Sequence, residues 1–374
     1  MTRSTGWWGK SGSCKLRPTA NPALAGFTAS KILWVRNHEP EVFAKCKKIL
    51  LPKDYIRFRL TGEFATDVSD ASGMQLLDVA RRVFSEEVLE QLSLSPALFA
   101  RPVESVDITG GITPDVAAET GLQAGTPVVG GAGDNAAAAV GTGVVVDGKA
   151  FTTIGTSGVV YAHTSQMKLD PLGRVHTFCS AVPGEWHVMG VTLAAGLSLQ
   201  WFKNQFCQEE ILAAEASGMD IYRLLDQLAE TVPIGSERLL YLPYLMGERT
   251  PHLDPNARGV FLGLSGMHEK RHLLRSVIEG VTFSLCDCIN ILREMGAPVS
   301  DMAACGGGGS SAFWRQMLAD AFDCPVKTLH GKEGAAAGAA ILAGVGTGMY
   351  PSVAAACEQL MQIDQVQQPM AERV

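Results

Sequence analysis

The chain has 374 residues, more than one ordinary hydrophobic core accommodates, so the sequence predicts two domains. Hydrophobic residues make up 47% of it and charged residues 18%, which is typical of globular proteins and excludes an intrinsically disordered chain. The net charge is −7, no long run of Lys and Arg occurs, and no apolar stretch reaches the length of a membrane span, so nucleic acid and membrane are disfavoured as partners.

Residues 1–20 form a polar, Gly-rich segment without hydrophobic periodicity. From Asn21 onward, the sequence predicts a first domain that ends near residue 146, at a turn rich in Val, Asp and Gly. Prolines and glycines delimit its elements. The domain is predicted to contain helices over residues 31–37, 39–48, 53–60, 83–92 and 114–120, a strand over 126–131, and a helix beginning near 136.

The second predicted domain, residues 147–374, opens with a hairpin whose strands cover 150–154 and 159–163. Near its end the order strand, glycines, helix, strand, helix is typical of α/β nucleotide-binding folds. The sequence therefore predicts two α/β domains with a cleft between them. The further strands are predicted over 187–191, 238–243, 302–304 and 326–329, and the helices over 194–206, 221–231, 269–295, 311–322 and 335–342.

The turn of that hairpin, Gly155-Thr156-Ser157-Gly158, has the composition of an anion-binding nest. Glycines let backbone N–H groups converge, and hydroxyls add donors. Asp134 lies about twenty residues upstream, at the junction of the predicted strand and helix, where α/β proteins place catalytic groups. A helix-capping Asp and an ordinary hairpin explain each feature alone. Together they favour phosphoryl transfer to a hydroxyl.

Four consecutive glycines at 306–309 follow a predicted strand and precede a helix. Bare backbone at a helix N-terminus suits the ribose or phosphate of a nucleotide. A dinucleotide fingerprint needs a third glycine where Ser311 stands, so a Rossmann-type dehydrogenase is disfavoured. A glycine-rich loop at a domain interface is the structural alternative.

The nine cysteines are odd in number and scattered along a large chain, which favours reduced thiols and a cytoplasmic location. The eight histidines include no His-Glu-x-x-His motif, so a zinc ion held by the protein is disfavoured.

Several motifs occur in an order that resembles the FGGY family of carbohydrate kinases. Within that family, the Gly-Asp-Asn and Gly-Glu-Arg-Thr-Pro-His forms are most similar to xylulokinases. The resemblance covers nearly everything after Asn21. Its segments are LLPKDYIRFRLTGEFATDVSDASG at 50–73, GGAGDNAAAAVGTG at 130–143, TIGTSG at 153–158, YLMGERTPHLDPNARGVFLGL at 244–264, HLLRSVIEG at 272–280 and GGGGSSAFWRQMLAD at 306–320.

The resemblance implies an α/β, actin/hexokinase-like fold, in which two ribonuclease-H-like domains close on ATP, Mg²⁺ and a sugar. The expected reaction is ATP-dependent phosphorylation of a ketopentose such as D-xylulose, and a homodimer is left open. Asp134 is then the general base and an indirect contact of Mg²⁺, and Asp134 and Asn135 bind the sugar. The ATP-binding residues are then Gly155, Thr156, Ser157, Gly158, Gly307, Gly308 and Gly309.

Some family segments have no counterpart in this sequence. These are the first phosphate-binding turn, Asp-x-Gly-Thr-Ser, and the Met-His-Gly and Trp-Asn-Asp segments, and the chain stops short of the family's closing helix. We therefore expect a truncated form whose first domain is incomplete and which turns over little substrate. Two alternatives stay open: a non-catalytic nucleotide-binding remnant, and a family member that acts on ribulose, rhamnulose or gluconate.

Overall fold

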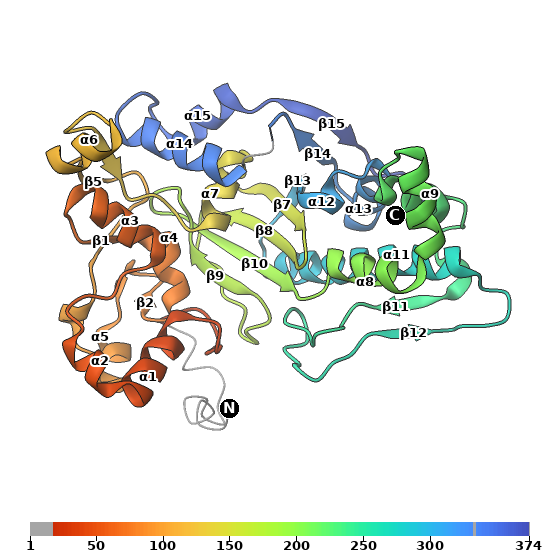
Figure 1. Ribbon diagram of the computed structural model, residues 1–374, viewed down its shortest axis with the longest axis horizontal. Helices are drawn as coiled ribbons and strands as arrows, with labels where there is room; N and C mark the ends of the chain where they lie inside the picture. Colours follow the sequence, from red (N-terminus) through yellow and green to blue (C-terminus); the bar gives the residue numbers. More distant parts are fainter. Residues whose placement is uncertain (1–17, 332–333, 374) are drawn as a thin grey trace. The chain divides into compact units, whose positions relative to one another are not determined.

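The computed structural model describes residues 18–331 and 334–373, which form two compact units that are each discontinuous in sequence (Figure 1). Most of the predicted segment 1–20 lies outside the described residues. The predicted domain limits at residues 20 and 146 stay a prediction. Unit 1 consists of Met1–Val146, His163–Val188 and Gly331–Met361, and unit 2 of Asp147–Ala162, Met189–His330 and Gln362–Val374.

Unit 1 is built of short helices and two-stranded pairings, with β1 parallel to β4, and β2–β3 and β5–β6 antiparallel. Its helices are α1 (Thr28–His38), α2 (Pro40–Lys45), α3 (Pro52–Thr61), α4 (Val68–Ala71), α5 (Glu86–Gln91), α6 (Pro114–Thr120), α7 (Asp134–Gly141), α14 (Gly334–Gly346) and α15 (Val353–Leu360). Its paired strands are β1 (Ala65–Asp67), β2 (Leu77–Asp78), β3 (Val83–Phe84), β4 (Arg101–Val103), β5 (Ile108–Gly111) and β6 (Pro127–Val129).

Helix boundaries in unit 1 follow the local sequence. Helix α6 begins at a proline, is capped by the Thr113 hydroxyl, and ends at Gly121 in the left-handed conformation, so its predicted bounds are confirmed. The single helix predicted over 83–92 is wrong. The first two of those residues form β3, and the Ser85 hydroxyl then accepts a hydrogen bond from the Val88 N–H, which starts α5 only after the cap.

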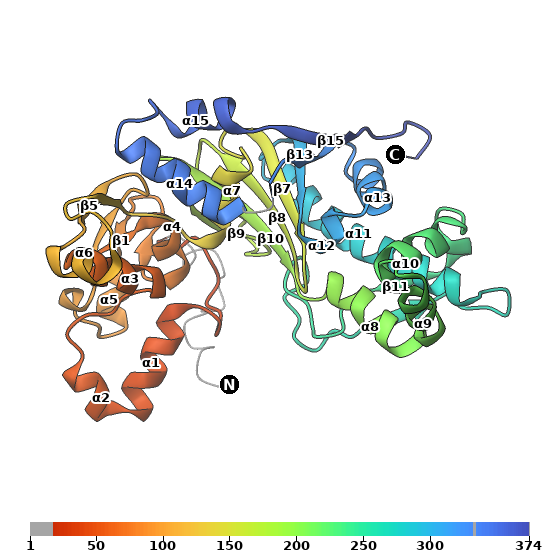
Figure 2. The same cartoon turned by 45° about the horizontal axis from the view of Figure 1, so that its top comes forward.

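Helices α7 and α14 lie side by side in both views, and they pack backbone to backbone (Figures 1 and 2). A Cβ atom added at Gly338 would lie 1.8 Å from the carbonyl oxygen of Ala137. One added at Gly141 would lie 1.7 Å from the carbonyl oxygen of Gly334. These glycines therefore set the distance between the two helices. Around this contact, Ala136, Val140, Ile341 and Leu342 are among the residues of a hydrophobic cluster.

A seven-stranded sheet has the order β15-β14-β13-β7-β8-β10-β9, and two of its strands, β8 and β10, contain residues of both units. Strand β13 is parallel to β7 and to β14, whereas β7–β8 and β14–β15 are antiparallel. The predicted hairpin is confirmed. The strands are β7 (Gly148–Ile154), β8 (Gly158–Thr164), β9 (His176–Cys179), β10 (Trp186–Thr192), β13 (Val299–Cys305), β14 (Val326–Leu329) and β15 (Ile363–Gln367).

The helices of unit 2 centre on α11 (Lys270–Glu294), which is buried along most of its length and packs against α8, α10, α13 and β11. Strands β11 (Leu240–Leu242) and β12 (Val260–Leu262) form a separate antiparallel pair. The remaining helices are α8 (Gly196–Phe206), α9 (Gln208–Ser217), α10 (Ile221–Glu230), α12 (Gly306–Gly309) and α13 (Ala312–Phe322).

The four consecutive glycines form one helical turn, α12, rather than an open loop between strand and helix. The reason is close packing on the end of β7. A Cβ atom at Gly306 would lie 2.8 Å from the carbonyl oxygen of Ile154, and one at Gly308 would lie 2.5 Å from the Ile154 Cγ2 atom. Two of the glycines are therefore required by the fold itself.

In the part of the chain that the structure describes, no helix has both the length and the apolar character needed to cross a membrane. Every cysteine in that part is a free thiol.

Candidate functional site

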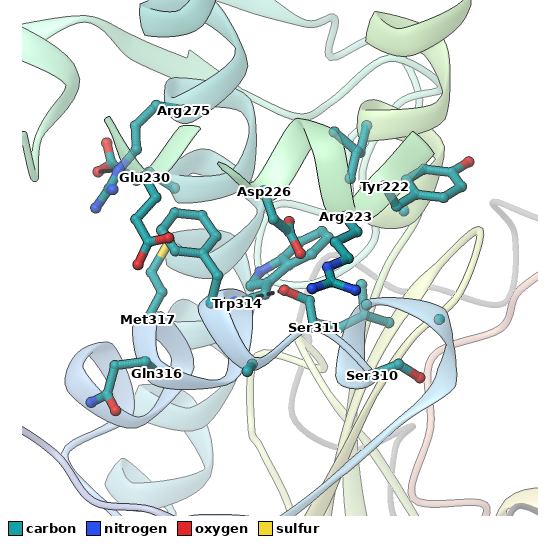
Figure 3. A pocket seen from close by; sticks show the side chains of 18 of the residues that line it. Tyr222, Arg223, Asp226, Glu230, Arg275, Ser310, Ser311, Trp314, Gln316 and Met317 are labelled. Atoms are coloured by element: carbon teal, nitrogen blue, oxygen red, sulfur yellow. Dashed lines mark hydrogen bonds and ion pairs between the residues drawn. The ribbon is translucent and has the colours of Figure 1, made fainter. Parts of the chain in front are cut away.

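Unit 2 contains a cavity of about 1440 Å³ at the end of β7 (Figure 3). Four of the residues predicted to bind ATP line it together: Gly155 and Thr156 from the hairpin turn, and Gly307 and Gly308 from α12. Segments about 150 residues apart thus meet at one surface, as the motifs predict. Helices α10, α11 and α13 supply the other walls.

Three other predicted ATP-binding residues, Ser157, Gly158 and Gly309, are not among the residues that line the cavity. Two of them have packing roles. A Cβ atom at Gly158 would lie 2.6 Å from Thr192 Oγ1, and one at Gly309 would lie 3.0 Å from the carbonyl carbon of Ala304. The roles of all three in ATP binding stay predictions.

Backbone hydrogen bonds hold the hairpin turn against the start of α8. The carbonyl oxygen of Gly155 accepts from the Gly196 N–H at 2.7 Å, and that of Thr156 accepts from the Ala195 N–H at 3.0 Å. Gly155 has no left-handed φ, and a Cβ atom there would meet only the Ser157 carbonyl oxygen, at 3.8 Å. The fold therefore does not require glycine at 155, and its role in ATP binding stays a prediction.

The polar face of α10 forms a wall that the sequence analysis missed. Its side chains are spaced as on one helix face, a pattern that also describes an ordinary solvated helix. In Figure 3 the Arg223 guanidinium and the Asp226 carboxylate point toward Ser311. Burial raises the pKa of Asp226, and a hydrogen bond from Ser311 opposes the shift. The face consists of Arg223, Asp226, Gln227 and Glu230.

A buried ion pair on α11 lies beside the C-terminal end of α10, where Arg275 Nη1 donates to the carbonyl oxygens of Ala229 and Val232. Arg275 Nε donates to Glu279 Oε1 at 2.7 Å, and the guanidinium lies over the Phe313 ring at 5.1 Å from the ring centre. Glu279 also accepts from the Gly235 N–H and the Ser236 hydroxyl. Both charges are thus satisfied within the protein. The exposed side chains of Ile234 and Phe283 line the same cavity. They are suited to contact an apolar or aromatic group of a ligand.

Unit 1 contains the candidate catalytic carboxylate. Asp134 is exposed and is the first residue of α7, so it lies on a helix N-terminus and not at the end of β6, which stops at Val129. Its Oδ1 atom accepts from the Asn135 backbone N–H at 2.8 Å and from the Asn135 side-chain amide at 3.1 Å. Oδ2 accepts no hydrogen bond from the residues that the structure describes, so it is available to a ligand.

Glu248, in the loop after β11, is a buried acid of unit 2 with a perturbed pKa. Its Oε1 atom accepts from the backbone N–H groups of Leu193 and Arg249, at 2.9 and 2.6 Å. Its Oε2 atom is buried without a hydrogen bond from the described residues. Burial raises the pKa of Glu248 to about 7, against the lowering effect of these hydrogen bonds.

A raised acid pKa makes the folded state bind a proton more tightly than the unfolded state. The stabilising contribution of Glu248 is therefore complete below about pH 4.5 and is lost as the pH rises through about 7. Glu248→Gln removes this titrating group, so we expect the loss to be absent in the variant. The free energy of unfolding of the variant minus that of the wild type should therefore increase by about 3 kcal/mol from pH 4.5 to pH 8. Urea denaturation across that pH range measures it. Exposed Glu215→Gln is the control, and parallel curves for wild type and Glu248→Gln would contradict the prediction.

Among residues 18–331 and 334–373, no group of three or more His, Cys, Asp or Glu side chains could hold a metal ion by itself. Mg²⁺ in nucleotide-dependent enzymes is held by one or two carboxylates, waters and the substrate phosphates, so an all-protein cage is not needed. The exposed carboxylate of Asp134 fits such an indirect role.

Comparison with protein families gives two matches along the chain. The N-terminal domain of the FGGY family of carbohydrate kinases matches residues 13–141, and the C-terminal domain of the same family matches residues 150–347.

Curated relatives match over almost the full chain. The xylulose kinases of Bacillus subtilis (strain 168) and Escherichia coli (strain K12) are each 42% identical to it, over 98% and 95% of this chain and 71% of each relative. The gluconokinase of Bacillus licheniformis is 34% identical over 94% of this chain and 69% of its own length.

Solved structures give the same result. A structure titled a xyloylose kinase from Brucella ovis is 36% identical, with a TM-score of 0.86 over 96% of this chain and 71% of that one. A ligand-bound xylulose kinase from Lactobacillus acidophilus is 29% identical, with a TM-score of 0.87 over the same shares. The predicted actin/hexokinase-like α/β fold is confirmed by these neighbours.

Proposed function

Because the chain belongs to the FGGY family of carbohydrate kinases, an enzyme family that phosphorylates alcohol groups with ATP, we propose that its substrate is D-xylulose and its product xylulose 5-phosphate. One observation in this structure supports the proposal most directly. Four residues from two distant motifs, Gly155, Thr156, Gly307 and Gly308, line one cavity. That cavity has both backbone-rich and apolar walls, as an adenine nucleotide requires.

Asp134 takes the role of general base. Its free Oδ2 atom would accept the proton of the attacking sugar hydroxyl, while Asn135 fixes the other oxygen. The backbone N–H groups of the turn at Gly155 and Thr156 would stabilise charge on the transferring phosphoryl group. Mg²⁺, when bound with ATP, neutralises phosphate charge, and Asp134 is the residue that would contact it through water. ATP as substrate and free thiols are both consistent with a cytoplasmic location.

The sugar is tested by comparing D-xylulose, D-ribulose, L-rhamnulose and gluconate in an ADP-release assay with the purified protein. We expect kcat/KM to be about ten-fold higher for D-xylulose than for the others. A higher value for gluconate would move the assignment toward the Bacillus licheniformis relative. Nucleotide binding without turnover of any sugar would instead support a non-catalytic remnant.

The nucleotide site is tested at Gly307, where an added Cβ atom meets no atom within 4 Å. The Cβ atom of a Leu side chain there would displace no protein atom, and because Gly307 lines the cavity we expect the side chain to occupy part of it. We expect Gly307→Leu to weaken ADP binding about ten-fold or more, by calorimetry, with an almost unchanged melting temperature. Gly266→Leu is the control, because Gly266 also has open space but does not line the cavity. Unchanged ADP affinity in Gly307→Leu would exclude α12 from the nucleotide site.

A further inference from the structure

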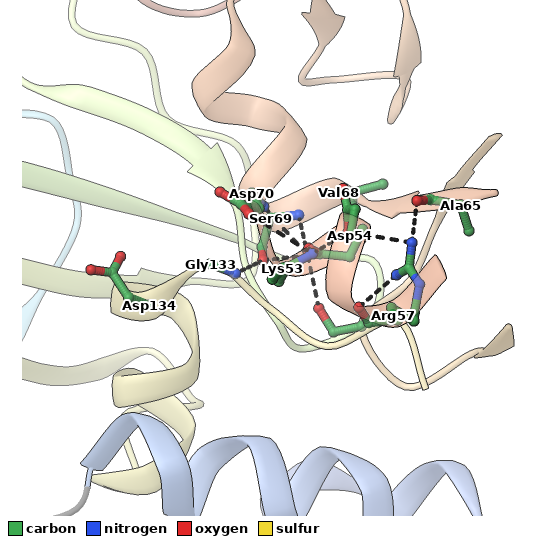
Figure 4. A network of polar contacts seen from close by, with 12 residues as sticks. Lys53, Asp54, Arg57, Ala65, Val68, Ser69, Asp70, Gly133 and Asp134 are labelled. Carbon is green, nitrogen blue, oxygen red and sulfur yellow. Dashed lines mark hydrogen bonds and ion pairs between the residues drawn. The ribbon is translucent and has the colours of Figure 1, made fainter. Parts of the chain in front are cut away.

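The loop over residues 130–133, which leads into Asp134, is held by side chains from α3 and α4 (Figure 4). Arg57 Nη1 donates to the carbonyl oxygen of Gly130 at 2.9 Å. The backbone N–H of Gly133 donates to Ser69 Oγ at 3.0 Å. A Cβ atom added at Gly133 would lie 3.4 Å from the Asp70 Cα atom, so the loop touches α4 directly. All of these residues belong to unit 1.

Behind this loop lies a network of buried charges. Lys53 Nζ lies 2.7 Å from Asp54 Oδ1, 2.5 Å from Asp67 Oδ1 and 3.8 Å from Asp70 Oδ2. The side chains of Asp54 and Asp67 are fully buried. Burial works to lower the pKa of Lys53, but Asp67, Asp54 and Asp70 together raise it. Lys53 therefore stays protonated and neutralises part of the charge of these carboxylates, of which Asp54 is also paired with Arg57 at 3.3 Å.

Ser69 connects this network to the catalytic segment. Its hydroxyl donates to Asp67 Oδ2, the carboxylate that Lys53 holds, and accepts from the Gly133 N–H. Gly133 is the N-cap residue of α7, and Asp134 follows it. Figure 4 shows the Asp134 carboxylate on the side of Gly133 away from Lys53. The hydroxyl thus has a fixed donor on one side and a fixed acceptor on the other, so it has one orientation.

We propose that Ser69, oriented by Asp67 and Lys53, is a positioning residue that fixes Gly133 and thereby the carboxylate of Asp134. This inference rests on the proposed function, since it assigns Asp134 as the base. Proton transfer needs the base within hydrogen-bond reach of the hydroxyl, and a small displacement of a catalytic group lowers the rate strongly. Ser69 touches neither sugar nor nucleotide in this scheme and acts only through the start of α7.

A double-mutant cycle separates this role from simple stabilisation. We expect Ser69→Ala to lower kcat for D-xylulose about ten-fold, with KM for ATP within about two-fold of the wild type. In an Asp134→Asn background, Ser69→Ala should lower the residual kcat no further, because the group that it positions is no longer a base. An equal loss in both backgrounds, or an unchanged kcat in the single variant, would overturn the inference.

Ser72 provides a matched control on the same segment. Its buried hydroxyl donates to the carbonyl oxygen of Val68 at 2.7 Å and accepts from the Cys179 N–H at 3.0 Å, so it stabilises unit 1 without contacting the loop. We expect Ser72→Ala to lower the melting temperature, and to change kcat by the same factor whether residue 134 is Asp or Asn.

Hydrogen–deuterium exchange gives a readout that does not depend on turnover. Peptides that cover residues 130–136 should exchange faster in Ser69→Ala than in the wild type, and not in Ser72→Ala. A wild-type protein that phosphorylates no sugar would contradict the proposed function. Unchanged exchange in Ser69→Ala would instead overturn the inference itself, so the two failures are distinguishable.

Discussion

Asp134→Asn is expected to lower kcat for phosphorylation of D-xylulose by about 10²-fold or more, with ADP affinity nearly unchanged. Asn is almost isosteric with Asp, and its side-chain oxygen can keep the hydrogen bonds that Asp134 Oδ1 accepts from Asn135. The substitution therefore removes the basic Oδ2 atom and little else. The ADP site is expected to be spared, since four of the predicted nucleotide residues line a cavity of unit 2 whereas Asp134 belongs to unit 1.

The measurements are steady-state kinetics for kcat and calorimetry for ADP binding. Asp115→Asn is a matched control, because Asp115 is also an exposed Asp in the first turn of a short helix of unit 1. It should leave kcat unchanged. If Asp134→Asn kept more than about a tenth of the wild-type kcat, Asp134 would not be the base, since the expected loss is larger.

Gly338→Ala is expected to destabilise the protein by about 3 kcal/mol or more, toward the upper end of the range for overpacking. The added Cβ atom would lie 1.8 Å from the Ala137 carbonyl oxygen and 3.0 Å from the Gly141 backbone nitrogen. Both neighbours are backbone atoms of α7, so no side-chain rotation can relieve the clash. The two helices must move apart, and the cluster around Val140 and Ile341 must open with them.

Thermal and urea denaturation measure this effect, and for a chain of this length it corresponds to a decrease of about 4 °C or more in melting temperature. Gly334→Ala on the same helix is the control. A Cβ atom there would have its nearest neighbour at 3.8 Å, an ordinary contact, and Ala favours helix over Gly. Equal melting temperatures for the two variants would show that the helices can separate without cost.

Much of the local structure could be predicted from the sequence, because caps and turns are local signals. Thr113, Pro114 and Gly121 delimit α6 as expected. The prediction failed over residues 83–92, where the apolar Val83 and Phe84 resemble the start of the following helix and only the Ser85 cap separates them. No conformation was predicted for the four glycines, whose helical turn packs on β7 through contacts that no local pattern contains.

Some residues of the candidate site could likewise be predicted from the sequence, and others could not. Motifs found Gly155, Thr156, Gly307 and Gly308, because a Gly-Thr-Ser-Gly turn between two apolar strands and a run of four glycines are distinctive patterns in the sequence itself. The α10 wall was missed, since polar residues on one helix face normally mean only that solvent covers it. The link from Ser69 to Gly133 joins residues far apart in the sequence, and only the folded chain brings that hydroxyl to the start of α7.

The packing of α14 on α7 also bears on how the chain folds as it is synthesised. The helix that carries Asp134 leaves the ribosome long before its partner, residues 334–346, has been translated. Until then its small, apolar face has nothing to cover it, and unit 1 lacks its last segment, Gly331–Met361. Contacts between such distant segments are slow to form, and exposed apolar surface favours association with other chains. We therefore expect unit 1 to mature only after residues 331–361 have left the ribosome, and to depend on chaperones until then.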